Sequence, residues 1–157
     1  MKAATINELK KELTAIAPQQ VMDICLRLAR FKKENKELLT YLLFEEGNEE
    51  AYILSVQNEI AAQFEEVNKA NLYFAKKTIR KILRLTNKYS RYSGNKETEV
   101  RLLIHFCLQL KNSGIAFKKS TALDNLYQSQ LNKIEKAIAA MEEDLQYDYR
   151  KGLQQLH

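Results

Sequence analysis

The sequence predicts an all-α protein, and three observations support that prediction. The chain has 157 residues but only four glycines and one proline, whereas β-sandwiches and barrels need turn residues roughly every 8–12 positions. Hydrophobic residues make up 45% and charged residues 29%, which is typical of a globular chain. Apolar residues recur at three- and four-residue steps, as on one helix face. We therefore expect a single all-helical domain over residues 1–157, a bundle or short helical-hairpin array of about six helices.

Residues 5–46 are expected to form short helices. Thr5 and Glu8 fit a capping box, and Pro18 suits the first turn of a second helix because its missing N–H is not needed there. Gly47 is a natural residue for a left-handed cap after the third helix. Apolar residues form a stripe on each helix, and those of the third are expected to face inward: Leu38, Leu39, Leu42 and Leu43.

Residues 48–92 continue the helical period, with Asn48 as the N-cap. A phase slip in the apolar pattern falls at residues 68–71. The segment is therefore either one long bent helix or two helices broken near Asn71, and we favour the single helix. Residues 93–95 (Ser-Gly-Asn) are expected to end it.

The last two helices differ in their apolar pattern. Residues 95–113 are apolar on more than one face, which is typical of a central, buried helix. Residues 121–151 alternate three- and four-residue apolar steps like a coiled coil, so this helix is the candidate assembly surface, and Gly152 is expected to fray its end. The coiled-coil-like stripe consists of Tyr127, Leu131, Ile134, Ile138, Met141, Leu145 and Tyr149.

Charge is segregated along the chain. Residues 67–96 contain nine basic residues and no acidic one, so the +5 net charge arises here, while the rest of the chain nets −4. Residues 34–66 show the opposite bias, with nine glutamates against Lys36. Six cations recur at helical spacing and define what we call the basic face: Lys77, Arg80, Lys81, Arg84, Lys88 and Arg91.

Three interpretations of the basic face remain open. It pairs with acidic helices of the same chain or of a second copy, it docks an acidic protein, or it contacts RNA or DNA. Over residues 76–91 the face is long enough to follow several phosphates. Tyr73, Tyr89 and Tyr92 lie within or beside it, where exposed rings would stack on bases.

No motif for catalysis, a metal or a cofactor is found, so we expect a non-enzyme without cofactors. His105 and Cys107 are two residues apart, and such residues do not share a helix face. Cys25 and Cys107 are expected to be buried, reduced thiols. Without an apolar leader or an 18-residue apolar run, we expect a cytoplasmic protein that does not enter membranes.

These observations favour a non-catalytic helical module that works by protein–protein contact or self-association. The alternative is a nucleic-acid-binding protein that uses the basic face.

Overall fold

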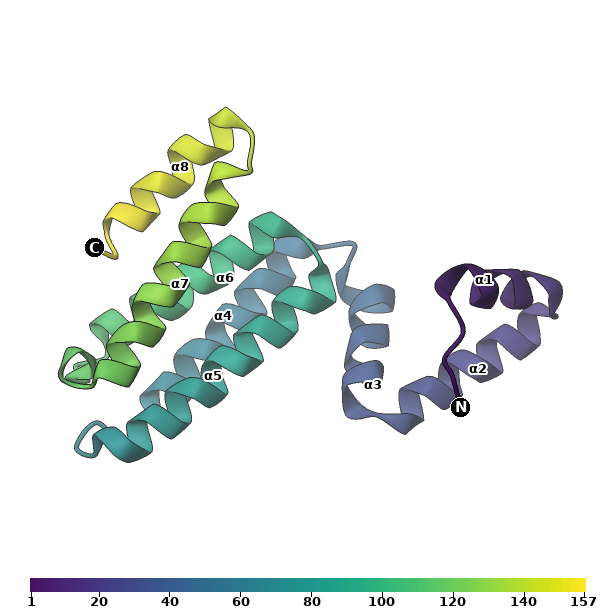
Figure 1. Ribbon diagram of the computed structural model, residues 1–157, viewed down its shortest axis with the longest axis horizontal. Helices are drawn as coiled ribbons and strands as arrows, with labels where there is room; N and C mark the ends of the chain where they lie inside the picture. Colours follow the sequence, from purple (N-terminus) through teal and green to yellow (C-terminus); the bar gives the residue numbers. More distant parts are fainter. The chain divides into compact units, whose positions relative to one another are not determined.

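The computed structural model describes all 157 residues and contains helices but no strands (Figure 1), so the all-α prediction is confirmed, with eight α-helices rather than about six. The chain forms two compact units, Met1–Phe44 and Glu45–His157. The elements are α1 (Ile6–Ala15), α2 (Pro18–Phe31), α3 (Lys33–Thr40), a π-helix η1 (Tyr41–Glu45), α4 (Glu49–Glu65), α5 (Leu72–Ser93), α6 (Lys96–Asn112), a 3₁₀-helix η2 (Phe117–Lys119), α7 (Thr121–Ala139) and α8 (Glu143–Gln154).

The first unit consists of α1, α2 and α3, and the predicted helix starts are confirmed. The Thr5 amide donates to Glu8 Oε2 at 2.7 Å and the Glu8 amide donates to Thr5 Oγ1 at 3.3 Å, which completes the capping box. Pro18 occupies the first turn of α2. Helices α2 and α3 pack against each other, and Asn35 Nδ2 donates to the Leu28 carbonyl oxygen at 2.8 Å. None of the three helices has a buried residue.

The second unit is organised around α6, which packs against α4, α5 and α7. The prediction that residues 95–113 form a buried, central helix is confirmed. Apolar residues cover more than one face of α6 because three neighbours pack against it. Its fully buried apolar side chains are Val100, Leu102, Leu103, Phe106, Cys107 and Leu110.

Of the two alternatives for residues 48–92, the favoured single long helix is wrong and the pair of helices broken near Asn71 is confirmed. Helix α4 ends at Glu65 and α5 begins at Leu72, and both pack against α6 and against each other. A single straight helix cannot place residues 49–65 and residues 72–93 side by side against α6. The chain therefore has to reverse direction between them. Asn71 caps the new start because its Oδ1 accepts from the amides of Tyr73 (3.0 Å) and Phe74 (3.3 Å).

The continuous C-terminal helix expected over residues 121–151 is also wrong. It breaks after Ala139, and α8 packs back against α7 (Figure 1). Leu153 and Leu156 are thereby buried, and the Tyr127 hydroxyl donates to the Leu156 carbonyl oxygen at 2.7 Å. The buried part of the coiled-coil-like stripe is Tyr127, Leu131, Ile134 and Ile138. The α7 part of the stripe therefore belongs to the chain's own core, whereas Leu145 on α8 is exposed.

Glycines end only some of the helices. Gly94 follows α5 in the left-handed conformation (φ 67°), which glycine adopts without a Cβ penalty. Gly114 after α6 also has a positive φ, of 77°. The left-handed cap expected at Gly47 is wrong, since its φ is not positive. Gly152 lies inside α8 rather than fraying its end, and a Cβ there would stand 3.7 Å from Ile104 Cδ1.

Candidate interaction surfaces

The basic face lies along α5, opposite the side that enters the core. Ile79 and Ile82 are fully buried, whereas Lys77, Arg80 and Arg84 are exposed. Lys81 and Arg91 are exposed as well, and Lys88 is half-buried. From Lys77 to Arg91 the face extends ~21 Å at the α-helical rise per residue.

Three glutamates of the second unit have partners on α6 and α7. Arg101 Nη2 of α6 donates to Glu50 Oε2 at 2.8 Å, and this hydrogen bond holds the pKa of Glu50 below its usual value. Thr98 donates to Glu49 at 2.6 Å. Burial opposes ionisation of Glu99, but Lys133 (2.8 Å) and Lys96 (3.1 Å) lower its pKa overall.

No carboxylate lies within ion-pair distance of five residues of the basic face: Lys77, Arg80, Lys81, Arg84 and Arg91. Within the second unit, these five cations therefore form no ion pair with the acidic residues of α4 and α6. Positive charges at i, i+4, such as Lys77 and Lys81, repel each other and destabilise a helix by about 0.2–0.5 kcal/mol per pair. These five positions are exposed, and no ion pair within the second unit neutralises their charge.

Two exposed aromatic rings precede the basic face. Tyr73 is 65% and Phe74 52% exposed, with ring centroids 5.5 Å apart and planes at 77°. Lys76 Nζ stands 6.0 Å from the Tyr73 ring centroid. Tyr89 and Tyr92, in contrast, are half-buried and contact each other edge-on at 5.9 Å. Of the three tyrosines expected to stack, only Tyr73 presents an open ring.

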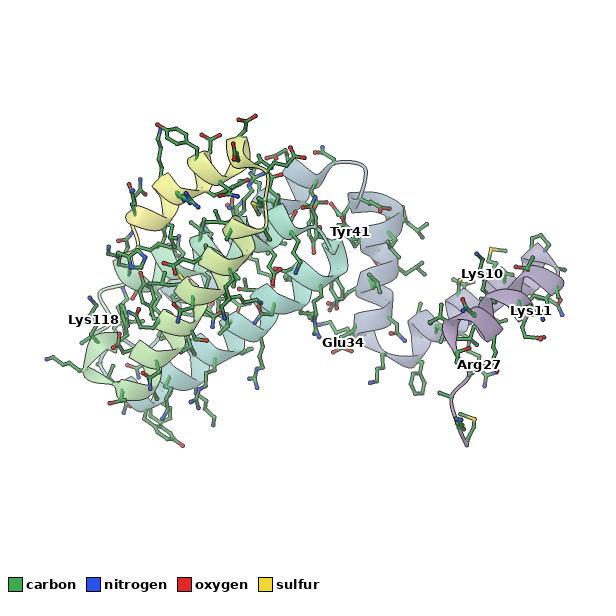
Figure 2. The ribbon with its side chains drawn as sticks, turned by 45° about the horizontal axis from the view of Figure 1, so that its top comes forward. Lys10, Lys11, Arg27, Glu34, Tyr41 and Lys118 are labelled. Carbon is green, nitrogen blue, oxygen red and sulfur yellow. The ribbon has the colours of Figure 1, made fainter.

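The second exposed surface is apolar and belongs to the first unit. Leu28 is 55%, Phe31 76% and Ile6 79% exposed. The third-helix residues expected to face inward are also open, except for the half-buried Leu39. We call this surface the N-terminal apolar surface; it comprises Ile6, Leu9, Leu13, Met22, Ile24, Leu26, Leu28, Phe31, Leu38, Leu42, Leu43 and Phe44. Figure 2 shows side chains of this unit projecting outward from its helices, whereas those of α4–α8 fill the spaces between helices.

A groove of about 220 Å³ opens between α2 and α3 within this surface. Its walls are apolar except for the Asn35 amide, which is bonded to the Leu28 carbonyl oxygen. The groove is lined by Cys25, Leu28, Ala29, Asn35, Leu38, Leu39 and Leu42. Cys25 is therefore exposed, contrary to the expectation of two buried thiols, while Cys107 is buried and its pKa is raised to about 12 by burial.

His105 and Tyr149 are engaged within the fold of the second unit. His105 is half-buried, and its Nε2 lies 3.0 Å from the Gln57 carbonyl oxygen, so Nε2 carries the proton. Burial lowers the pKa of His105, although the Gln57 hydrogen bond opposes the shift. Burial and hydrogen bonding to Glu97 raise the pKa of Tyr149. The chain brings no three His, Cys, Asp or Glu residues together as metal ligands.

The chain resembles no protein family, curated protein or solved structure closely enough to suggest a function. No protein-family model matches the chain, and no match was found among curated proteins or solved structures. None of the helices combines the length and apolar character that crossing a membrane requires.

Sequence patterns alone revealed the basic face but not the N-terminal apolar surface. One sequence signal for this surface was the wide spread of apolar residues around α2. Its apolar residues, from Val21 to Phe31, cover well over half of the helix circumference, which is unusual for a helix with a solvated side. The Tyr73–Phe74 pair was a second signal, since two adjacent aromatic residues stand one turn before Lys77.

Proposed function

We propose that this protein is a non-catalytic helical interaction module that docks a protein partner on the N-terminal apolar surface. The observation that supports the proposal is that α1, α2 and α3 have no buried residue, although each carries an apolar stripe. Helices gain most of their stability by burying such a stripe against something else. The first unit buries too little of these stripes by itself, and in this proposal a partner covers the rest.

The size of the surface fits a protein partner. The twelve exposed apolar side chains present on the order of 1,000 Å², comparable with the ~800 Å² that each partner contributes to a standard interface. The groove between α2 and α3 has the form that receives one apolar ridge of an amphipathic helix.

Photocrosslinking in the producing cells tests this function. A photoreactive phenylalanine analogue replaces Leu28 on the apolar side of α2 or, as a matched control, the exposed Arg30 on its polar side. We expect a covalent protein adduct from position 28 and none from position 30. Adducts of twice the 18.3 kDa chain mass identify a second copy, and other masses identify a different partner. No adduct from position 28, or equal adducts from both positions, overturns the proposal.

The basic face supports a second candidate function, nucleic-acid binding. Its support is the set of five exposed cations without a carboxylate partner in the chain. Phosphate contacts release counterions, so binding would weaken linearly in log–log plots against salt concentration. Acidic proteins remain the competing class of ligand for this face.

Titration of the full chain with short RNA and DNA across a salt series tests the second candidate. Replacing Arg80, Arg84 and Arg91 with glutamate is expected to abolish binding. A matched control makes the same charge change at Lys10→Glu, Lys11→Glu and Arg27→Glu, three exposed positions of the first unit labelled in Figure 2. Absence of binding by the unmodified chain at low salt, or equal loss in both triple variants, contradicts nucleic-acid binding at this face.

A further inference from the structure

We infer that α5 binds single-stranded nucleic acid, with Tyr73 and Phe74 stacking on unpaired bases and the basic face following the phosphates. The inference rests on the second candidate function and specifies its ligand. Three observations on this one helix support it: the position of the rings, their exposure, and the uncompensated charge.

The rings and the cations share one face of α5. Tyr73 precedes Lys77 by four residues and Arg80 by seven, and Phe74 precedes Lys77 by three and Lys81 by seven. Residues at these spacings lie above one another on a helix. A strand that follows the cations along α5 therefore reaches the two rings at the helix start.

The rings are open where an aromatic residue of a helical protein would normally be buried. Tyr73 and Phe74 expose 65% and 52% of their surface, and the edge-on contact between them occupies only one face of one ring. Asn71 fixes the backbone beneath both rings, because its side chain accepts from their two amides. The two rings are therefore held at a defined place rather than on a loose loop.

This combination favours a single strand over other polyanions. Duplex bases are already stacked on one another, so they offer no free faces to a ring at the helix start, whereas unpaired bases do. An acidic protein segment would satisfy Arg80 and Arg84 but has no flat bases to cover the two rings. Cations spaced over ~21 Å match a strand of several nucleotides, within the site sizes of known single-strand-binding proteins.

The experiment compares four probes on the full chain at low salt. They are a ~12-nucleotide single-stranded RNA, the corresponding DNA, the DNA duplex, and polyglutamate as a polyanion without bases. We expect both single strands to bind more tightly than the duplex and polyglutamate. The two single-stranded arms show whether RNA or DNA is the better ligand.

Substitutions then separate stacking from charge. The pair Tyr73→Ala and Phe74→Ala is expected to weaken single-strand binding roughly tenfold or more while leaving the salt slope unchanged. Tyr73→Leu with Phe74→Leu keeps apolar bulk and should lose affinity likewise. Arg80→Gln with Arg84→Gln is expected to reduce the salt slope by roughly 0.7 for each phosphate that the variant no longer neutralises.

Tyr147 provides a matched control. It is 64% exposed on α8, with Lys151 Nζ 4.4 Å from its ring centroid. It therefore has an exposed ring beside a lysine, as Tyr73 does, but lies outside α5. Tyr147→Ala should leave affinity unchanged, and circular dichroism of every variant verifies the fold.

Two results overturn the inference in different ways. Equal affinity for duplex and single strands, or unchanged affinity after both Tyr73/Phe74 replacements, eliminates base stacking while nucleic-acid binding by the basic face stands. Absence of binding to any nucleic acid at low salt, or equally tight binding of polyglutamate, eliminates both the inference and the second candidate function.

Discussion

Replacing one leucine by alanine in each unit measures how much core each unit possesses. Leu103 on α6 is fully buried, so Leu103→Ala removes buried methyl groups and leaves a cavity, which we expect to lower the free energy of unfolding by about 3–5 kcal/mol. Leu28 on α2 is 55% exposed. Fully burying a leucine side chain stabilises a protein by ~1.5–3 kcal/mol. Because less than half of Leu28 is buried, Leu28→Ala should lower the free energy of unfolding by only about 1 kcal/mol.

Urea denaturation followed by circular dichroism gives the two stability changes, and amide hydrogen exchange in α2 and α6 assigns each change to its own unit. A loss above about 2 kcal/mol for Leu28→Ala in the purified chain would refute the description of this surface as open. A loss below about 2 kcal/mol for Leu103→Ala would equally contradict the role of α6 as the central helix.

Three further predictions follow from single residues. A maleimide should label Cys25 in the native protein and Cys107 only after unfolding, because burial raises the pKa of the Cys107 thiol to about 12. Gly94→Ala should destabilise by on the order of 1 kcal/mol in thermal unfolding, since φ is 67° there, whereas Gly47→Ala should change stability by less than about 0.5 kcal/mol. The lowered pKa of His105 predicts that stability falls as pH drops below about 6.5, with a slope of at most ~1.4 kcal/mol per pH unit.

The sign for His105 follows from proton uptake. Burial keeps the folded imidazole neutral, so the unfolded chain binds the proton first, and acid favours unfolding between the unfolded pKa and the lower folded one. His105→Gln should flatten the unfolding profile in that window. Identical pH profiles for the unmodified protein and His105→Gln would contradict the His105 prediction. Labelling of both thiols in the native chain would contradict the cysteine prediction, and equal effects of alanine at Gly94 and Gly47 would contradict the glycine prediction.

Local signals in the sequence predicted most helix starts because capping depends on nearby residues. The capping box at α1 is formed by Thr5 and Glu8. At α4 and α6, the side chains of Asn48 and Asn95 accept hydrogen bonds from backbone amides of the first turn, as N-caps do. The break after Ala139 carries no such signal, since the apolar spacing continues through it. It exists because Leu153 and Leu156 are buried only when α8 returns along α7. That packing is tertiary, and no local pattern encodes it.

The candidate surfaces show the same division. Charge at helical spacing predicted the basic face, since a row of cations without apolar neighbours has to remain near solvent. The sequence could not show which cations the glutamates of α4 pair with, because that depends on how the helices pack. In the structure α6 lies against α4, and Glu50 of α4 pairs with Arg101 of α6 rather than with the basic face. The apolar stripe on α1 was visible in the sequence. Such a stripe predicts that another surface packs against the helix, but it does not identify that surface. What covers the stripe is decided by packing, and the first unit by itself leaves α1 without a buried residue.

The arrangement of α4–α8 also bears on how fast this unit folds. Each of these helices packs against the helix next to it in the chain, and the most extensive further pairing, between α4 and α6, spans a single intervening helix. Contacts between chain neighbours require only short loops to close, which is the property that lets helical bundles fold in microseconds to milliseconds. During synthesis, α6 can therefore pack against α4 and α5 as soon as it has itself left the ribosome, before α8 has emerged.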